Sequence, residues 1–488
     1  MERHICNFKS VGDHAEGIGE LIINGNSVEF YFKGKTTPSQ RCFIGRDTEH
    51  TYKVFVSGYG ESSANCSLDA ACPFKVNSVL AQNYDFNDDL DTNGITECSF
   101  IIPELVLWLN FATIERGFTE DGVLAIAEKV TNPIILKDSN PHIEITFELG
   151  TFRDGIDTFT EMTLIKKPRI TITYANEETV ERVNNDIAHI MQFFGLLISH
   201  VSDVQEIRLK YKDKDLYTWL YENYDYSYNL RHTQLEYSSL THFEEMNDSI
   251  TEYFSTWYEF CYNPKYDLIR IWYFTCNKRK DIFAEDVFVY YVRFIEGYYL
   301  RRSGAEEEAE KIKNTIDKFG DKIKEIIFCE ENKDDFSEII NQAIPDWKFN
   351  SKHAKEVSNW IARGYLNRSD LKKSLTTYDN SYFNIISRNA CHVVLFKKAS
   401  EEEIIKTYFD NIVKTRNYYS HFKSDNTGVL SFAQLQKTIN VLKAVIVMIF
   451  FECMEMDKKE IQQYIIRDPE LMEQTYDIRL DFNQRMEG

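Results

Sequence analysis

The spacing of hydrophobic residues changes near residue 176, and this change limits the folds open to the chain. Before it, short alternating or β-branched runs predict strands, and Gly25 and Asn26 lie between two such runs as in a tight hairpin. After it, apolar residues recur every three or four positions, as in helices. The sequence therefore predicts an α+β multidomain protein, with a β-rich, sandwich-like or partly open barrel domain before an all-α bundle.

The pattern also predicts individual elements and three domains. We expect helices at Val180 to Leu209, Glu285 to Arg302, Ala305 to Phe328, Asp334 to Ala343, Lys352 to Ala362 and Glu401 to Lys414, with a strand-like stretch at Leu268 to Thr275. The predicted domains are a β-rich sensor (1–175), a helical, aromatic-rich middle region (176–304) and a C-terminal helical domain (305–488).

The clearest helix is the last long one. Its apolar residues step by alternating threes and fours along one side: Phe432, Leu435, Ile439, Leu442, Ile446, Ile449 and Cys453. Between Val441 and Phe451 the other sides are apolar too. A helix that is apolar on several sides must be covered on several sides, so we expect a homodimer or higher homo-oligomer.

Several features indicate a cytoplasmic protein without membrane segment or cofactor. The longest apolar run, Ala444 to Phe451, is too short to span a bilayer, and the charged N-terminus leads into no apolar signal region. Ten cysteines without a CxxC pattern indicate reduced thiols, and no phosphate-binding, dinucleotide-binding or structural zinc pattern is present. The sequence leaves open a zinc site assembled from scattered cysteines.

Charge is distributed unevenly. Residues 1–300 contain 27 Lys and Arg against 46 Asp and Glu, whereas residues 341–400 contain ten cations against four acids. The acidic part repels phosphate, and the basic stretch is suited to a polyanion unless its cations form ordinary solvated helix faces.

One motif has a chemical rationale: Arg416, Asn417 and then His421, an Arg-x4-His. Histidine exchanges protons near neutral pH, and arginine holds a phosphate and stabilises charge that builds on it, so the pair suits metal-free RNA cleavage. A looser match, Arg182 to His189, lies within one predicted helix. We expect Arg416 to end a helix and His421 to lie beyond it, because residues five apart in one helix point about 140° apart.

The C-terminal part resembles a HEPN domain of the Apea-like family. The resemblance rests on TRNYYSHF, from Thr415 to Phe422, and on FIEGYYLRR, from Phe294 to Arg302, which matches a Glu-x-Tyr-x-x-Arg-Arg theme. By position, it implies that Arg416 and His421 are catalytic, that Asn417 orients the site, and that Glu296 occupies an accessory acidic position.

The resemblance also implies a metal-independent endoribonuclease acting in antiphage abortive infection. Such a protein dimerises so that two motifs form one cleft, cleaves host RNA, with tRNA the expected substrate, and answers a phage protein sensed by its β-rich domain. The alternative is a catalytically silent HEPN scaffold whose β-rich domain binds a protein or glycan.

Overall fold

The computed structural model describes residues 2–11, 16–24, 27–34, 42–59, 71–82, 93–109, 114–118, 121, 124–128, 132–153, 162–212, 217–222, 226–229, 240–278, 282–302, 314, 325, 338, 342, 401–421 and 426–467. The chain divides into two compact units. The first comprises Met1–Tyr262 with Phe450–Asp468, and the second comprises Asn263–Ile449 with Pro469–Gly488.

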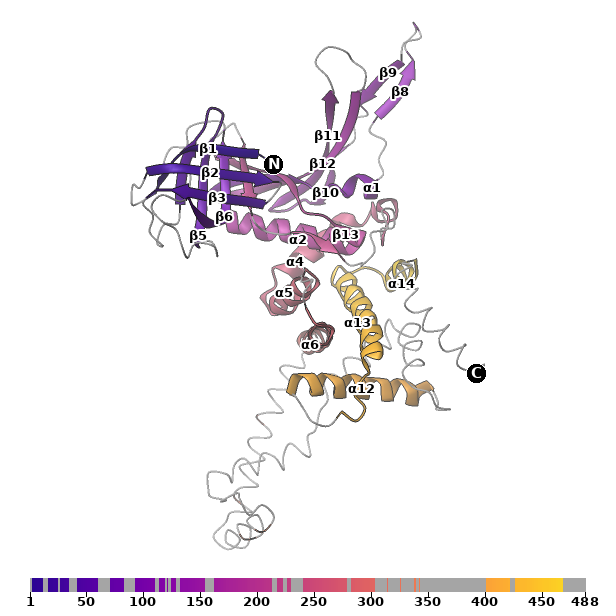
Figure 1. Cartoon of the computed structure of the whole chain (residues 1–488). Coiled ribbons are helices and arrows are strands. Elements are labelled where there is room, and N and C mark those ends of the chain that lie inside the picture. The colour runs from indigo at the N-terminus through magenta and orange to yellow at the C-terminus, as the bar shows by residue number, and fades with distance from the viewer. Residues whose placement is uncertain are drawn as a thin grey trace. The chain divides into compact units, whose positions relative to one another are not determined.

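The N-terminal strands of the first unit close into a barrel (Figure 1). In the order β6-β3-β2-β1-β4-β5, each strand pairs with the next, and β5 pairs back with β6. These strands are β1 (Glu2–Ser10), β2 (Glu16–Asn24), β3 (Ser27–Lys33), β4 (Cys42–Arg46), β5 (Thr51–Tyr59) and β6 (Cys72–Gln82). Asn24 pairs with Ser27, which confirms the predicted hairpin.

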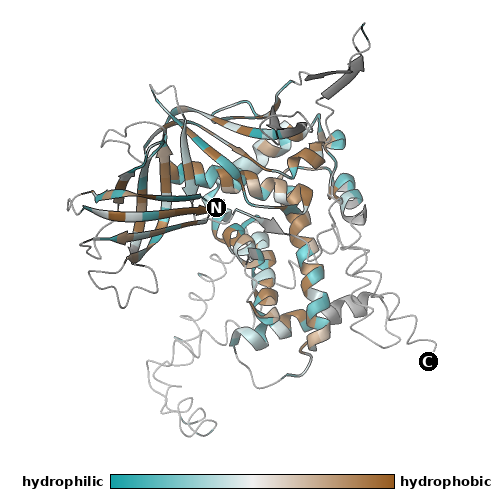
Figure 2. Cartoon of the chain, turned by 45° about the horizontal axis from the view of Figure 1, so that its top comes forward, coloured by the Kyte–Doolittle hydropathy of each residue, from teal (hydrophilic) through white to brown (hydrophobic). Residues whose placement is uncertain are grey.

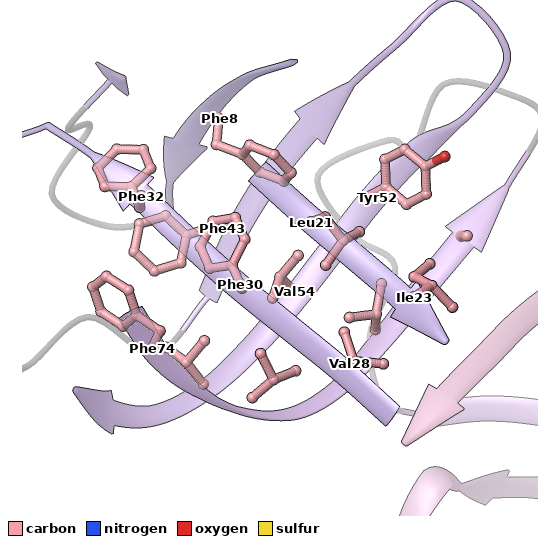
Figure 3. Packing of buried hydrophobic residues seen from close by; sticks show 14 of the residues in the cluster. Phe8, Leu21, Ile23, Val28, Phe30, Phe32, Phe43, Tyr52, Val54 and Phe74 are labelled. Atoms are coloured by element: carbon pink, nitrogen blue, oxygen red, sulfur yellow. The ribbon is translucent and has the colours of Figure 1, made fainter. Parts of the chain in front are cut away.

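Phenylalanines fill the barrel (Figure 3). Alternate residues of each strand point inward, as the change between hydrophobic and hydrophilic residues along these strands shows (Figure 2). The rings of Phe8 and Phe30 meet edge to face at 4.8 Å, and those of Phe43 and Phe74 do so at 5.0 Å. The Phe8 ring lies against Gly19 and Gly45, where any Cβ atom would collide with it. The interior is therefore a packed core.

The same sheet continues from β6 through six further strands. Their order is β15 (Thr218–Glu222), β14 (Gln205–Tyr211), β7 (Asn93–Ile101), β12 (Met162–Thr179), β11 (His142–Arg153) and β10 (Ile134–Lys137). Smaller elements of this unit are the pair β8 (Ile114–Phe118) and β9 (Leu124–Glu128), the pair β13 (His200–Val201) and β16 (Tyr228–Asn229), α1 (Leu105–Leu109) and α3 (Phe243–Met246).

Helix α2 (Val180–Ile198) packs on β12 and β7, and α4 (Ile250–Cys261) packs on α2 and β10. The Thr179 hydroxyl caps the start of α2 by accepting a hydrogen bond from the Arg182 N–H at 3.1 Å. The helix ends at Ser199, whose φ of 72° is left-handed. The predicted helix from Val180 to Leu209 is therefore wrong beyond Ile198, because β14 follows with Ile207 and Leu209 buried in alternation.

The second unit contains α5 (Pro264–Lys278), α6 (Ala284–Arg302) and α12 (Glu401–His421), with most of α13 (Phe432–Cys453); α14 (Lys458–Arg467) belongs to the first unit. The predicted strand-like stretch from Leu268 to Thr275 is wrong, because it lies inside α5. Its buried residues Ile269 and Tyr273 are four apart, and the Tyr273 ring meets the Phe294 ring of α6 at 5.7 Å.

The α+β class, with a β-rich domain before a helical part, is confirmed, and the β-rich domain contains a closed barrel. The helices predicted at Glu285 to Arg302 and Phe432 to Cys453 are confirmed as α6 and α13. Three further predicted helices, 305–328, 334–343 and 352–362, and the basic stretch 341–400 fall almost wholly outside the described residues.

Helix α13 is also long and apolar enough to cross a membrane by composition alone. Of its most apolar 18-residue window, 67% is buried inside the protein, as is usual in core helices. The expectation that the protein makes no membrane contact stays a prediction, as do its cytoplasmic location and the three domain boundaries.

Candidate active site

All three motif residues belong to one helix. Helix α12 runs without a break from Glu401 to His421, so Arg416 and Asn417 lie inside it and His421 is its last residue. The expected helix junction between Arg416 and His421 is therefore wrong. In a regular helix their Cα positions point about 140° apart and lie about 7.5 Å apart along the axis.

Arg416 is held by an acid from another helix. Its Nη2 donates to both carboxylate oxygens of Glu296 in α6, at 2.8 Å to Oε1 and 2.7 Å to Oε2. Each side chain is 22% exposed, so the pair is shielded but within reach of solvent. Helices α6 and α12 pack against each other, which brings Glu296 to Arg416 across 120 positions of sequence. The accessory acid that the resemblance indicated thus contacts the motif arginine.

Asn417 contacts the motif arginine and lies on the same face of α12 as His421. Its Oδ1 accepts a hydrogen bond from Arg416 Nη1 at 2.9 Å. Asn417 also lies four residues before His421, so these two share a face of the helix, about 40° apart. The guanidinium of Arg416 is therefore oriented from two sides, by Glu296 and by Asn417.

His421 is exposed at the end of α12. Among the described residues it has no ion pair or hydrogen-bond partner, so its ring is open to a substrate. Within one chain the structure brings Arg416, Asn417 and Glu296 together and leaves His421 apart from that contact.

Two buried polar atoms on the Arg416 face, Arg416 Nε and Ser420 Oγ, have no hydrogen-bond partner among the residues that the structure describes. They belong to residues four apart, one above the other on the helix. Buried polar groups in proteins are nearly always hydrogen-bonded, so these two atoms leave binding capacity for an oxygen from outside.

Thr415, the residue before the motif arginine, connects α12 to the segment that leads into α13. The Thr415 side chain is fully buried, donates to the Asn411 carbonyl at 2.7 Å and accepts from the Leu430 N–H at 2.9 Å. This contact ties α12 to the turn that leads into α13. Nothing in the sequence spacing singled out Thr415, because a helical threonine next to a motif is otherwise unremarkable.

The residues between Arg416 and His421 include an aromatic pair. The rings of Tyr418 and Tyr419 meet nearly perpendicularly, with centroids 5.1 Å apart. Partial burial raises the pKa of the Tyr419 phenol, and the charge of Glu285 adds to the effect. Tyr419 is therefore neutral at physiological pH, and both tyrosines offer hydroxyl groups and ring faces.

The looser match, Arg182 and His189, has a structural role in the first unit. Arg182 Nε lies 3.2 Å from Asp186 Oδ2, and its guanidinium stacks over the Tyr262 ring at 3.9 Å. The His189 ring lies against the same tyrosine at 4.7 Å. These contacts hold α2 to the end of α4 and account for the pair without catalysis.

The described part of the chain contains no cluster of metal-binding side chains. There, no three His, Cys, Asp or Glu side chains converge closely enough to hold a metal ion. The cysteines described there form no disulfide bond, and burial raises the pKa of Cys42 to about 11. Cys66 lies outside the described residues, so a zinc site that includes it stays open, as it does from the sequence.

Comparison with protein families matches two models. Residues 13–257 match ApeA N-terminal domain 1, and residues 289–460 match the Apea-like HEPN domain. The chain belongs to the Apea-like HEPN family. The HEPN match contains Glu296, Arg416 and His421, and the N-terminal match contains most of the barrel. Comparisons with curated proteins and with solved structures give no match.

HEPN domains are generally ribonucleases, and this pair of domains is that of a HEPN nuclease of the ApeA defence type.

Proposed function

We propose that this protein is a metal-independent endoribonuclease of antiphage abortive infection that cleaves host RNA, with tRNA as the substrate class. The observation that carries the proposal is the bidentate contact between Glu296 and Arg416, because it holds the motif guanidinium in one orientation before substrate arrives.

Each motif residue has a distinct role in the proposed reaction. Arg416 binds the scissile phosphate and stabilises the charge that develops on it, assisted by its own Nε and by the Ser420 hydroxyl. His421 takes the proton of the ribose 2′-OH, or donates one to the 5′-oxygen. Asn417 and Glu296 position the guanidinium. The products carry a 2′,3′-cyclic phosphate and a 5′-hydroxyl.

The proposed active form is a homodimer. One proton must be removed and another delivered: His421 performs one of these transfers, and water performs the other. Because Arg416 and His421 point to different sides of α12, a facing motif in a second chain supplies the missing group. In the same proposal, binding of a phage protein to the β-rich domain switches the nuclease on.

The test compares the full chain with its His421→Ala variant. Each is incubated with total tRNA in the presence of EDTA, and each is induced in bacteria with and without phage. Loss of the general base lowers cleavage by about 10²- to 10⁴-fold. During phage infection the wild type should leave 2′,3′-cyclic phosphate ends and stop growth, and His421→Ala should do neither.

The alternative, a catalytically silent HEPN scaffold, has one observation in its favour. The Arg416 guanidinium already donates hydrogen bonds to Glu296 and Asn417, which leaves fewer of its N–H groups for a substrate. Identical RNA patterns for wild type and His421→Ala during phage infection would support the scaffold and refute the nuclease. An activity that EDTA abolishes would refute the metal-independent mechanism.

A further inference from the structure

A second charged cluster lies in the first unit, on the sheet beyond the barrel, and the nuclease motif does not involve it. We call it the Glu206 cluster: Lys167, Arg169, Glu206 and Arg208. Lys167 and Arg169 belong to β12, and Glu206 and Arg208 belong to β14.

Glu206 has a strained backbone. Its φ is +52°, in the left-handed region that residues with a Cβ atom rarely adopt. The strain occurs at a β-bulge, because Gln205 pairs with Ile101 and Arg208 with Ser99, which leaves one extra residue on β14. Such outliers persist where the surroundings hold them, and they concentrate at sites that bind ligands.

Three cations converge on the Glu206 carboxylate. Lys167 Nζ lies 2.5 Å from Oε1, and Nη2 atoms of Arg169 and Arg208 each lie 2.9 Å from Oε2. Burial acts to raise the pKa of Glu206, but the hydrogen bonds and charges of Lys167 and Arg169 outweigh it and lower the pKa. The carboxylate is therefore ionised and occupies the centre of a cationic site.

The two arginines are also held by groups other than Glu206. Arg169 Nε pairs with Glu148 Oε1 at 2.8 Å, and its Nη1 reaches Ser99 Oγ at 3.5 Å. The Arg208 guanidinium stacks on the Trp219 ring at 4.7 Å. The arginines would keep their places if the Glu206 side chain turned away.

The cluster is open to solvent above a buried floor. Ile207 and Leu209 point into the core, so Glu206 and Arg208 lie on the opposite face of β14. The Arg169 side chain is 5% exposed and forms the floor, whereas those of Lys167 and Arg208 are 36% and 24% exposed. A small anion can therefore reach Arg169 between the two outer cations.

We propose that the Glu206 cluster binds a phosphate group, free or as a monoester, and that the Glu206 carboxylate occupies the place of this anion in the empty site. When Glu206 turns away, the cluster keeps three cations, Lys167, Arg169 and Arg208, and the one acid in contact with them is Glu148, on Arg169. Two positive charges are then unbalanced, which matches a phosphate dianion. Departure of Glu206 also allows its backbone strain to relax.

Calorimetric titration of the full chain with inorganic phosphate tests the site, with AMP in a second series at equal ionic strength. Glu206 competes with the ligand from within the protein, so Glu206→Gln should tighten binding by about tenfold. A gain of affinity cannot arise from misfolding. Lys167→Gln should weaken binding by about fivefold, because one of three cations is lost.

The matched control is Glu177→Gln, which removes a carboxylate from exposed Lys212 (2.7 Å) next to the same strand, and which should leave binding unchanged. Tighter binding of AMP than of phosphate assigns the site to a monoester, and equal binding assigns it to the free anion. The proposal is overturned if Glu206→Gln binds neither probe more tightly than the wild type, or if Lys167→Gln binds both equally well. Either result would make the cluster a structural ion-pair network, and neither bears on the proposed nuclease.

Discussion

Glu296 and Arg416 form a bidentate contact across 120 positions of sequence, with both carboxylate oxygens of Glu296 within 2.8 Å of Arg416 Nη2. The contact orients the guanidinium and partly neutralises it. In the proposed reaction, phosphate therefore binds to Nη1, which also donates to Asn417, and to Nε, which has no hydrogen-bond partner among the described residues. The acid acts on the proposed reaction by positioning Arg416.

The first prediction follows from this positioning role. Glu296→Gln keeps an acceptor for Arg416 but loses the second charge-assisted bond, and Glu296→Ala loses both. We expect kcat to fall by about tenfold in the first variant and by about 10²-fold in the second, with KM changed less, since each tenfold corresponds to about 1.4 kcal/mol of transition-state stabilisation. Single-turnover cleavage of tRNA measures the effect.

Asp286→Asn, which alters an exposed acid of the same helix, is the matched control and should have wild-type kinetics. Faster cleavage by Glu296→Ala would show that the acid restrains Arg416 instead of positioning it.

A second prediction concerns the stability of the first unit. Asp186 is fully buried and accepts hydrogen bonds from the hydroxyls of Tyr174, Tyr258 and Tyr262, at 2.9, 2.6 and 2.5 Å, besides its ion pair with Arg182. Asp186→Asn removes the charge and leaves Arg182 uncompensated. We expect the free energy of unfolding to fall by about 3 kcal/mol, measured by denaturant titration.

Exposed Asp248, just after α3, gives the control: Asp248→Asn should change the free energy of unfolding by less than about 0.5 kcal/mol. An equally small effect of Asp186→Asn would mean that the tyrosine hydroxyls alone hold α2 to α4.

Helix bounds were predicted well where the apolar residues keep a single helical period over the whole element. The stretch from Glu285 to Arg302 has this property, and α6 starts one residue earlier and ends at Arg302. The prediction failed where two periods meet: Val180 to Ile198 is helical, but Ile207, Leu209 and Tyr211 alternate as in a strand. The helix ends at Ser199, whose backbone is left-handed, and no Gly or Pro marks this helix end in the sequence.

Sequence reasoning found the motif but not its geometry. The resemblance named Arg416, Asn417 and Glu296, and the structure brings these three together. The predicted helix junction is wrong, because nothing in TRNYYSH breaks a helix and α12 continues to His421. The closure of the barrel could not be predicted from the sequence, for a different reason. The pairing of β5 with β6 joins strands whose partners are set by packing of the phenylalanine core.

A third prediction concerns alkaline pH. The Tyr253 hydroxyl of α4 donates to Glu460 Oε2 of α14 at 2.7 Å, and burial, followed by this hydrogen bond, raises the pKa of Tyr253 to about 12. In the unfolded chain a tyrosine titrates near pH 10. Since the folded pKa is the higher one, the stabilisation is complete below pH 10 and is lost as the pH rises to about 12.

The wild type should therefore exceed Tyr253→Phe in free energy of unfolding by about 1 to 2 kcal/mol at pH 9, and this difference should shrink toward pH 12. Denaturant titrations at one-unit pH steps measure it. Glu460→Gln keeps the Tyr253 phenol but removes the neighbouring charge. It should therefore narrow the pH range over which this stability difference is lost. A difference that stays constant from pH 9 to 12 would contradict the assigned cause.

The last prediction tests the composite site that follows from the continuous α12. Arg416 and His421 point to different sides of one helix, so each proposed site combines Arg416 of one chain with His421 of its partner. Arg416→Ala and His421→Ala should each be inactive alone. Coexpression in equal amounts makes half of the dimers mixed, each with one intact site, so activity should return to about a quarter of the wild-type value.

The doubly substituted chain, coexpressed with either single variant, forms no intact site and is the control. Light scattering must show dimers at micromolar concentration in the same samples. A monomeric protein that cleaves RNA, or dimers without any recovery, would place both catalytic groups within one chain's own motif and rule out this arrangement.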